Sequence, residues 1–158
     1  FKADTGDAIH RRSIYTYWKR GMPPPQMTIM NAPTRDACIA RRERTNTPSQ
    51  ALLLLNETEY LKAARSLAQM VVAANKDATK RLEMAYETVT SKLPDEGERR
   101  ILSKLSEDLQ KRYRENPALA EEICSGVPLQ DAHAKTELAG WTVLINTLYN
   151  LDITKTRE

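Results

Sequence analysis

Residues 47–55 have the sequence TPSQALLLL, and this stretch predicts where the helical part of the chain begins. Thr47 offers a hydroxyl for the N-cap, Pro48 suits the first helical position, which needs no N–H, and Gln50 is placed to close a capping box. The run at 51–55 is apolar on every side, which a short helix tolerates only when other elements surround it. We therefore expect a helix here that lies at the centre of the fold.

The chain after residue 55 carries further helix signals. Residues 56–59 repeat the cap pattern, and Asp95 with Glu98 opens another helix. Asn116 and Pro117 are expected to cap a short helix that ends at Gly126. Apolar residues recur at helical spacing in four stripes: Tyr60, Leu61, Ala64, Leu67, Ala68, Val71 and Val72; Leu82, Ala85, Tyr86 and Val89; Ile101, Leu102, Leu105, Leu109 and Tyr113; Leu138, Trp141, Leu144, Ile145, Leu148 and Tyr149.

These signals predict an all-α fold. No segment after residue 47 alternates polar and apolar residues with the period of a strand, so a sheet is not expected there. Short connections between the stripes favour antiparallel neighbours, in a bundle of about five to six helices over residues 47–158. Residues 1–46 are predicted to form an irregular arm, rich in Arg and Pro, that packs on this bundle, so that the two parts make one domain.

Positive charge is concentrated in the N-terminal part. The 158 residues include 24 Lys or Arg and 21 Asp or Glu, a net charge of +3. Residues 1–48 have nine basic and four acidic side chains, a net +5, and the rest of the chain has a net −2. Seven of the nine cations are Arg, which suits bidentate pairing with carboxylates or phosphates. The candidate contact residues are Arg11, Arg12, Lys19, Arg20, Arg41, Arg42, Arg44 and Asn46.

Two interpretations of the arginines at 41–44 stay open. They precede a helix N-terminus that already carries partial positive charge, so a negative group should compensate them. That group is either an internal carboxylate, such as Asp4, Asp36 or Glu43, or a bound anion held by Arg side chains and helix N–H groups together. If the arginines pair with internal carboxylates, we expect Asn46 to hydrogen-bond to the loop backbone rather than to a ligand.

Aromatic residues accompany the basic ones. Tyr15, Tyr17 and Trp18 lie close to the proline run at 23–25, and we expect them to form a small satellite core rather than a stacking platform. Basic residues interleaved with aromatics also suit nucleic-acid binding. The overall charge is modest and no nucleic-acid-binding motif is present, so that partner is not favoured.

Residue types that carry catalysis or hold metals are sparse. His10, His133, Cys38 and Cys124 include no pair at ligand spacing, so no zinc site is predicted, and whether the two cysteines pair stays open. The chain has no C-x-x-C-H motif for covalent haem and no G-x-S-x-G, G-x-G-x-x-G, P-loop or H-E-x-x-H motif. No catalytic residue and no cofactor are therefore predicted, and the longest apolar run, 51–55, is too short for a membrane span.

Three segments together resemble a known family: residues 11–20 (RRSIYTYWKR), residues 23–25 (PPP) and residues 41–56 (RRERTNTPSQALLLLN). They resemble a C-terminal domain of unknown function found in large proteins of planctomycetes and related bacteria. Trp141 and residues 150–152 and 156–158 are similar to the usual end of that domain, so the resemblance spans nearly the whole chain. The family domain is longer on its N-terminal side, and the chain starts at Phe1, so we expect it to be truncated there.

The resemblance implies an exported protein, periplasmic or at the cell surface, that often carries a planctomycete cytochrome c-like domain as well. It implies no activity. We predict a non-catalytic helical docking module whose basic arm contacts neighbouring domains of the same polypeptide, with an anionic ligand as a further partner. Two alternatives are a subdomain of an enzyme acting on an anionic substrate, such as a sulfated or acidic glycan, and a nucleic-acid-binding domain. The sequence leaves the enzyme question undecided and leans against catalysis.

Overall fold

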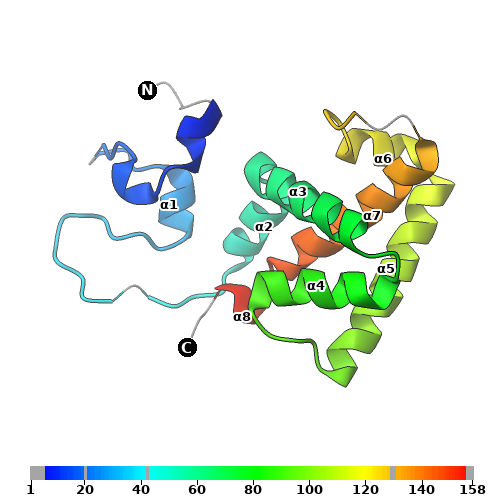
Figure 1. The fold of residues 1–158 in the computed structure, drawn as a ribbon. Helices are drawn as coiled ribbons and strands as arrows, with labels where there is room; N and C mark the ends of the chain where they lie inside the picture. The colour runs from blue at the N-terminus through cyan, green and yellow to red at the C-terminus, as the bar shows by residue number, and fades with distance from the viewer. Residues whose placement is uncertain (1–5, 20, 42, 129–130, 156–158) are drawn as a thin grey trace. The chain divides into compact units, whose positions relative to one another are not determined.

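The computed structural model describes residues 6–19, 21–41, 43–128 and 131–155 (Figure 1). The chain divides into two compact units, Phe1–Thr45 and Asn46–Glu158. Within the described ranges the regular elements are helices, with one isolated β-bridge and no strand, which confirms the predicted all-α fold. None of the helices in these ranges is both long and apolar enough to cross a membrane.

The helix predicted at residue 47 begins as its cap signals require. It is α2 (Pro48–Asn56), with Pro48 at its first position. The Thr47 hydroxyl accepts a hydrogen bond from the Gln50 backbone N–H (3.3 Å), and the Gln50 side-chain carbonyl accepts one from the Thr47 N–H (3.1 Å). This capping box satisfies backbone donors that a helix start otherwise leaves unpaired.

The prediction that α2 lies at the centre is wrong. Leu54 and Gln50 are buried, but Leu52 is 60% exposed and Leu55 is 45% exposed. The buried pair is four residues apart, which is one helical turn, so α2 presents a single face to the other helices. An apolar run without periodicity does not reveal which face will be covered.

Six further helices follow in the second unit (Figure 1): α3 (Thr58–Ala74), α4 (Ala78–Thr90), α5 (Glu96–Glu115), α6 (Pro117–Ile123), α7 (Ala132–Leu148) and α8 (Asp152–Lys155). The stripe predicted along α3 is confirmed, because its central members Ala64, Leu67, Ala68 and Val71 are all buried. Along α5, Leu102 and Leu109 are buried as predicted. Ile101, however, is 66% exposed and does not belong to the buried face.

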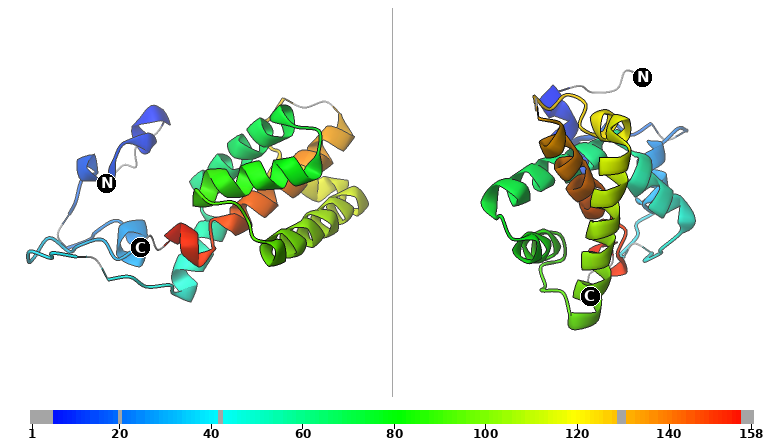
Figure 2. Two further views of the ribbon diagram at one scale, coloured as in Figure 1. Left: turned by 60° about the horizontal axis from the view of Figure 1, so that its bottom comes forward. Right: turned by 90° about the vertical axis from the view of Figure 1, so that its right-hand side faces the viewer.

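The central helix of the bundle is α7, which packs against α2, α3, α4, α5 and α6 (Figures 1 and 2). Residues 138–142 are buried at five consecutive positions, so every side of this stretch is covered. The Thr142 hydroxyl donates to the Leu138 carbonyl (2.8 Å), which satisfies it inside the core. A helix surrounded by others can therefore include polar residues when their groups find local partners.

Helix starts elsewhere follow the sequence signals only in part. The prediction that Asp95 and Glu98 open a helix is confirmed at α5, where the two residues form a capping box. At α3 the predicted cap is wrong: Asn56 ends α2 and donates its side-chain N–H to the Leu52 carbonyl (2.9 Å). At α6 the predicted start is confirmed, with Asn116 as the N-cap residue and Pro117 at the first position. The Asn116 side chain, however, donates to the Arg112 carbonyl (3.3 Å) instead of capping the helix, and α6 ends at Ile123 rather than at Gly126.

The first unit consists of short elements. Two 3₁₀ helices, Gly6–His10 and Ser13–Tyr15, precede α1 (Pro25–Ile29), which starts at the proline run. The Asn31 side chain donates to the Thr45 hydroxyl (2.5 Å) and so joins the two ends of the segment after α1. This unit is the basic arm, defined from here on as residues 1–45.

Candidate functional site

Basic residues singled out from the sequence are exposed wherever the structure describes the arm. This holds for Arg11, Arg12, Lys19, Arg41 and Arg44. Arg20 and Arg42 lie outside the described residues. Exposure leaves the five side chains accessible to an external partner.

The aromatic residues of the arm behave differently from one another. Trp18 is half-buried, and the Arg35 guanidinium lies 5.1 Å from the centre of its ring, a cation–π geometry. Tyr15 is 74% exposed and Tyr17 is 66% exposed. The expected satellite core therefore does not form around the two tyrosines, and only Trp18 has the partly covered position that it requires.

Asn46 connects the two ends of the second unit. Its side-chain amide donates to the Asp152 carboxylate (3.2 Å), and its carbonyl accepts from the Lys155 ammonium (2.5 Å). Asp152 and Lys155 are the first and last residues of α8, so Asn46 holds α8 beside the start of α2. This side chain braces the fold.

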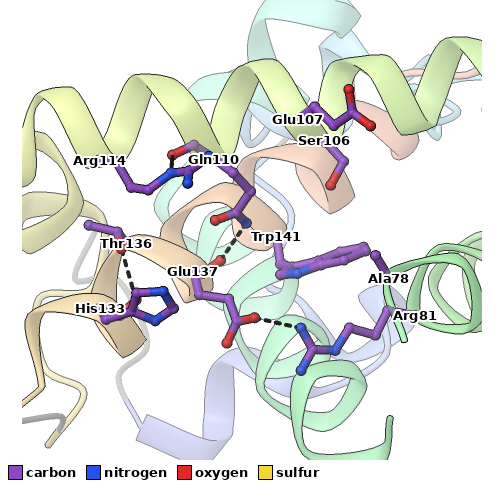
Figure 3. Close-up of a pocket in the computed structure, with 10 residues that line it drawn as sticks. All are labelled: Ala78, Arg81, Ser106, Glu107, Gln110, Arg114, His133, Thr136, Glu137 and Trp141. Atoms are coloured by element: carbon purple, nitrogen blue, oxygen red, sulfur yellow. Dashed lines mark hydrogen bonds and ion pairs between the residues drawn. The ribbon is translucent and has the colours of Figure 1, made fainter. Parts of the chain in front are cut away.

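A cavity of about 330 Å³ opens between α4, α5 and α7 (Figure 3). The wall formed by α5 consists of Ser106, Glu107, Gln110 and Arg114. These residues follow one another at spacings of one, three and four, so they share one face of the helix. The cavity is open to solvent, and charged groups lie along its length.

The facing wall comes from α7, and α4 closes one side. The α7 residues are His133, Thr136, Glu137 and Trp141. They too lie on one helical face, and the indole of Trp141 is almost fully buried beneath the polar groups. From α4, Ala78 and Arg81 complete the lining. Figure 3 shows these side chains converging from the three helices.

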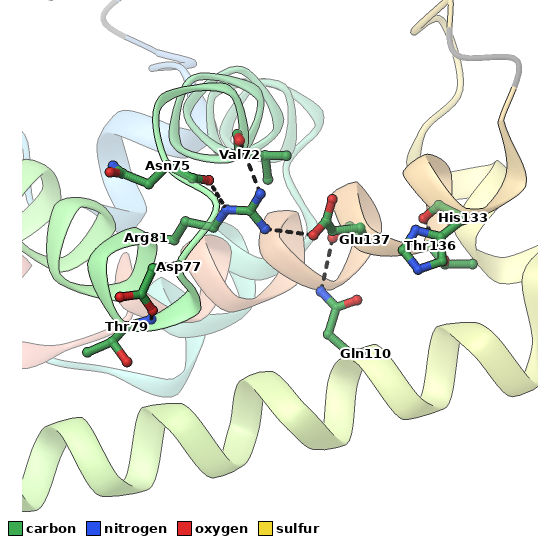
Figure 4. A network of polar contacts seen from close by, with 9 residues as sticks. All are labelled: Val72, Asn75, Asp77, Thr79, Arg81, Gln110, His133, Thr136 and Glu137. Carbon is green, nitrogen blue, oxygen red and sulfur yellow. Dashed lines mark hydrogen bonds and ion pairs between the residues drawn. The ribbon is translucent and has the colours of Figure 1, made fainter.

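Arg81 is the best-anchored charged residue of the cavity (Figure 4). It is 8% exposed, and its guanidinium donates to the Glu137 carboxylate at 2.6 Å. The same guanidinium donates to the backbone carbonyls of Asn75 (2.5 Å) and Val72 (3.2 Å) at the end of α3. Arg81 therefore joins α3, α4 and α7 through one planar group with several donors.

Gly140 of α7 lies against the Gln110 side chain of α5 beside the cavity. A Cβ at this position would lie 2.5 Å from the side-chain nitrogen of Gln110. That nitrogen donates to the Glu137 backbone carbonyl (3.1 Å). The missing side chain thus leaves room for the Gln110 amide to reach the α7 backbone.

Several polar groups of the cavity keep hydrogen-bonding capacity for a ligand. Within the described residues, the Ser106 and Glu107 side chains make no hydrogen bond or ion pair. The Arg114 Nε donates to the Gln110 carbonyl (3.1 Å), so the two terminal nitrogens of Arg114 can still donate to a ligand. Glu137 pairs with Arg81 through one carboxylate oxygen and keeps the other. The cavity therefore offers both donors and acceptors.

Arg81 and Glu137 are not among the residues predicted from the sequence. A signal existed: Arg81 adjoins Leu82 and lies one turn before Ala85, so it falls on the buried face of α4. A charged residue on such a face requires a partner. That partner is 56 residues away along the chain, and only the packing of α4 against α7 brings the two together.

The two cysteines are free thiols. Cys38 is exposed, whereas Cys124 is buried and donates to the Lys135 backbone carbonyl (3.3 Å). Burial raises the pKa of the Cys124 thiol, which makes it a poor nucleophile. In the described part of the chain, no group of three or more His, Cys, Asp or Glu residues is arranged to hold a metal ion.

Comparison with known protein families matches residues 1–106 to PSD1, a protein of unknown function (DUF1553). The chain belongs to this family. The match includes the whole basic arm, α2, α3, α4 and the first half of α5, so within this DUF1553 member the cavity lies partly inside and partly beyond the matched region. No curated protein and no solved structure matches the sequence significantly.

Proposed function

We propose that this DUF1553 chain is a non-catalytic docking module of a larger exported bacterial protein, with no cofactor of its own. Its basic arm is the surface that contacts a neighbouring domain, and the arginines pair with acidic groups of that domain or of an anionic ligand. Export and the multidomain setting are supported by the resemblance to C-terminal domains of large planctomycete proteins.

The observation that carries the proposal is the composition of the arm surface. Ile14 is 73% exposed, and Tyr15, Tyr17 and Met22 are exposed beside it in the chain. Exposed apolar residues gathered in one segment mark interaction surfaces, and exposed arginines add charge and hydrogen-bonding specificity. The same exposed arginines and tyrosines would also suit a nucleic acid, which the modest net charge of +3 does not favour.

Cys38 provides a direct test, because it is the exposed thiol of the arm and Cys124 is buried. We would attach a photoactivatable cross-linker to Cys38 in the full-length parent protein and map the products by mass spectrometry. Docking predicts cross-links from Cys38 to peptides outside residues 1–158. A matched control moves the thiol to the bundle, with Cys38→Ser and Lys80→Cys, and should give few such cross-links, since Lys80 is exposed on α4.

The role of the arginines is tested in the same experiment. Replacing Arg11, Arg12, Arg41 and Arg44 together by Gln should reduce the cross-links to other domains, because charge-assisted pairs with acidic groups are lost. Replacing exposed Arg100 and Arg112 of α5 by Gln serves as the control. Cross-links confined to residues 46–158 in the parent protein would contradict the docking function.

A further inference from the structure

The charges of the cavity between α4, α5 and α7 do not cancel locally. Arg81 and Glu137 neutralise each other through their ion pair. The remaining formal charges of the lining are one cation, Arg114, and one anion, Glu107, both on α5 and both exposed. The cavity therefore offers a positive group and a negative group that are not paired with each other.

These two charges lie at opposite ends of the lining. Glu107 and Arg114 are seven residues apart, which corresponds to about 10 Å along the axis of an α-helix. Figure 3 shows Arg114 and His133 on opposite walls at one end of the cavity, and Ser106 and Glu107 at the other end. A ligand that satisfies both ends must itself carry a negative and a positive group separated by a similar length.

We infer that this cavity binds a free di- or tripeptide, with the peptide carboxylate at Arg114 and the terminal ammonium at Glu107. An extended peptide spans about 3.3–3.6 Å per residue, so three residues cover about 10 Å. The cavity volume of about 330 Å³ lies within the range of small-ligand sites. This inference is independent of the docking function of the arm.

Groups between the two ends suit the middle of such a peptide. The second carboxylate oxygen of Glu137 accepts a peptide N–H, and the Ser106 hydroxyl donates to a peptide carbonyl. Ala78 and the edge of Trp141 provide apolar contact for a small side chain. A simple anion at Arg114 would leave Glu107 unused at the other end, whereas a zwitterion engages both ends.

The test is calorimetric titration of the whole chain with trialanine, N-acetyl-trialanine and trialanine amide. Trialanine is expected to bind, and blocking either terminus should weaken binding about tenfold or more, because a charge-assisted hydrogen bond is lost. The variants Glu107→Gln and Arg114→Gln should each weaken trialanine binding by a similar factor. Lys111→Gln, an exposed position on α5 outside the lining, is the matched control and should change little.

Titrating the two variants with the two blocked peptides shows which residue binds each end of the peptide. N-acetyl-trialanine should bind the wild type and Glu107→Gln equally, and trialanine amide should bind the wild type and Arg114→Gln equally. All three substituted positions are exposed, and circular dichroism checks that each variant keeps its helices. Absence of trialanine binding at millimolar concentration, binding that is unchanged by terminal blocking, or tighter binding of glucuronate than of trialanine would each overturn the inference.

Discussion

Tyr86 shows how one residue can tie two helices together. Its side chain is 2% exposed on α4, and its hydroxyl donates to the Glu98 carboxylate at 2.7 Å. Glu98 also accepts from the Asp95 N–H (2.9 Å) as part of the α5 capping box. Burial, together with the neighbouring carboxylate, raises the pKa of Tyr86 to about 12. The phenol therefore stays protonated in the folded chain at pH values where an unfolded tyrosine ionises.

Tyr86 should make stability depend on alkaline pH. The pKa of Tyr86 is higher in the folded chain than in the unfolded chain, so the protonated phenol favours folding. This contribution to the free energy of unfolding is complete below the unfolded pKa near 10. It is lost as the pH rises toward 12, which amounts to about 2–3 kcal/mol in all. The Tyr86→Phe variant has no hydroxyl and therefore lacks this pH-dependent contribution to stability. Urea unfolding at pH 8, 10 and 11 should show the wild type more stable than Tyr86→Phe at pH 8, with the difference shrinking above pH 10. A difference that stays constant up to pH 11 contradicts the role of the buried hydroxyl.

At the scale of elements, Arg81 closes the end of one helix and connects it to another. The last carbonyls of a helix have no partner within it. Arg81 satisfies the Val72 and Asn75 carbonyls at the end of α3 and pairs with Glu137 of α7 at the same time. The ion pair is more buried at the arginine, whose side chain is 10% exposed, than at Glu137, whose side chain is 31% exposed.

Removing this connection should destabilise the bundle. Arg81→Met keeps much of the side-chain volume but leaves two carbonyls and a carboxylate unpaired, at a cost of about 2–4 kcal/mol in the free energy of unfolding. Glu137→Gln should cost less, because the position is partly solvated and keeps an acceptor. Chemical denaturation measures both values, with Lys80→Met, an exposed neighbour on α4, as the control. Equal stability of Arg81→Met and Lys80→Met would contradict the connecting role.

Predictions for individual helices succeeded where a local pattern was sufficient. The α3 stripe and the capping boxes of α2 and α5 depend on residues within a turn or two of each other, and the structure confirms them. The position of α2 was wrong, because a run of leucines without periodicity does not show which side its neighbours cover. Helix α7 was unrecognised as the central helix for a different reason: its sequence shows one apolar stripe, and Gly140 and Thr142, which lie off that stripe, do not reveal that the other sides are covered too.

At the scale of the whole molecule, the hydrophobic core belongs to one unit. Its buried members run from Ala64 on α3 to Leu148 on α7. We predict that residues 46–158 alone fold cooperatively with a helical circular dichroism spectrum, since they contain this entire core. Residues 46–131, which lack α7 and α8, are the control and should not fold, because α7 packs against every other helix from α2 to α6. Cooperative melting of the shorter fragment would contradict the central position of α7.

The sequence by itself determined the all-α fold class, the starts of α2, α5 and α6 and the concentration of positive charge in the arm, because periodicity, caps and charge are properties of neighbouring residues. The tertiary structure alone decided which helix is central, that Arg81 meets Glu137, and that α5 and α7 leave a cavity with a cation and an anion at its ends. These features join residues far apart in the chain, and their distances depend on how the helices pack, which no local pattern encodes.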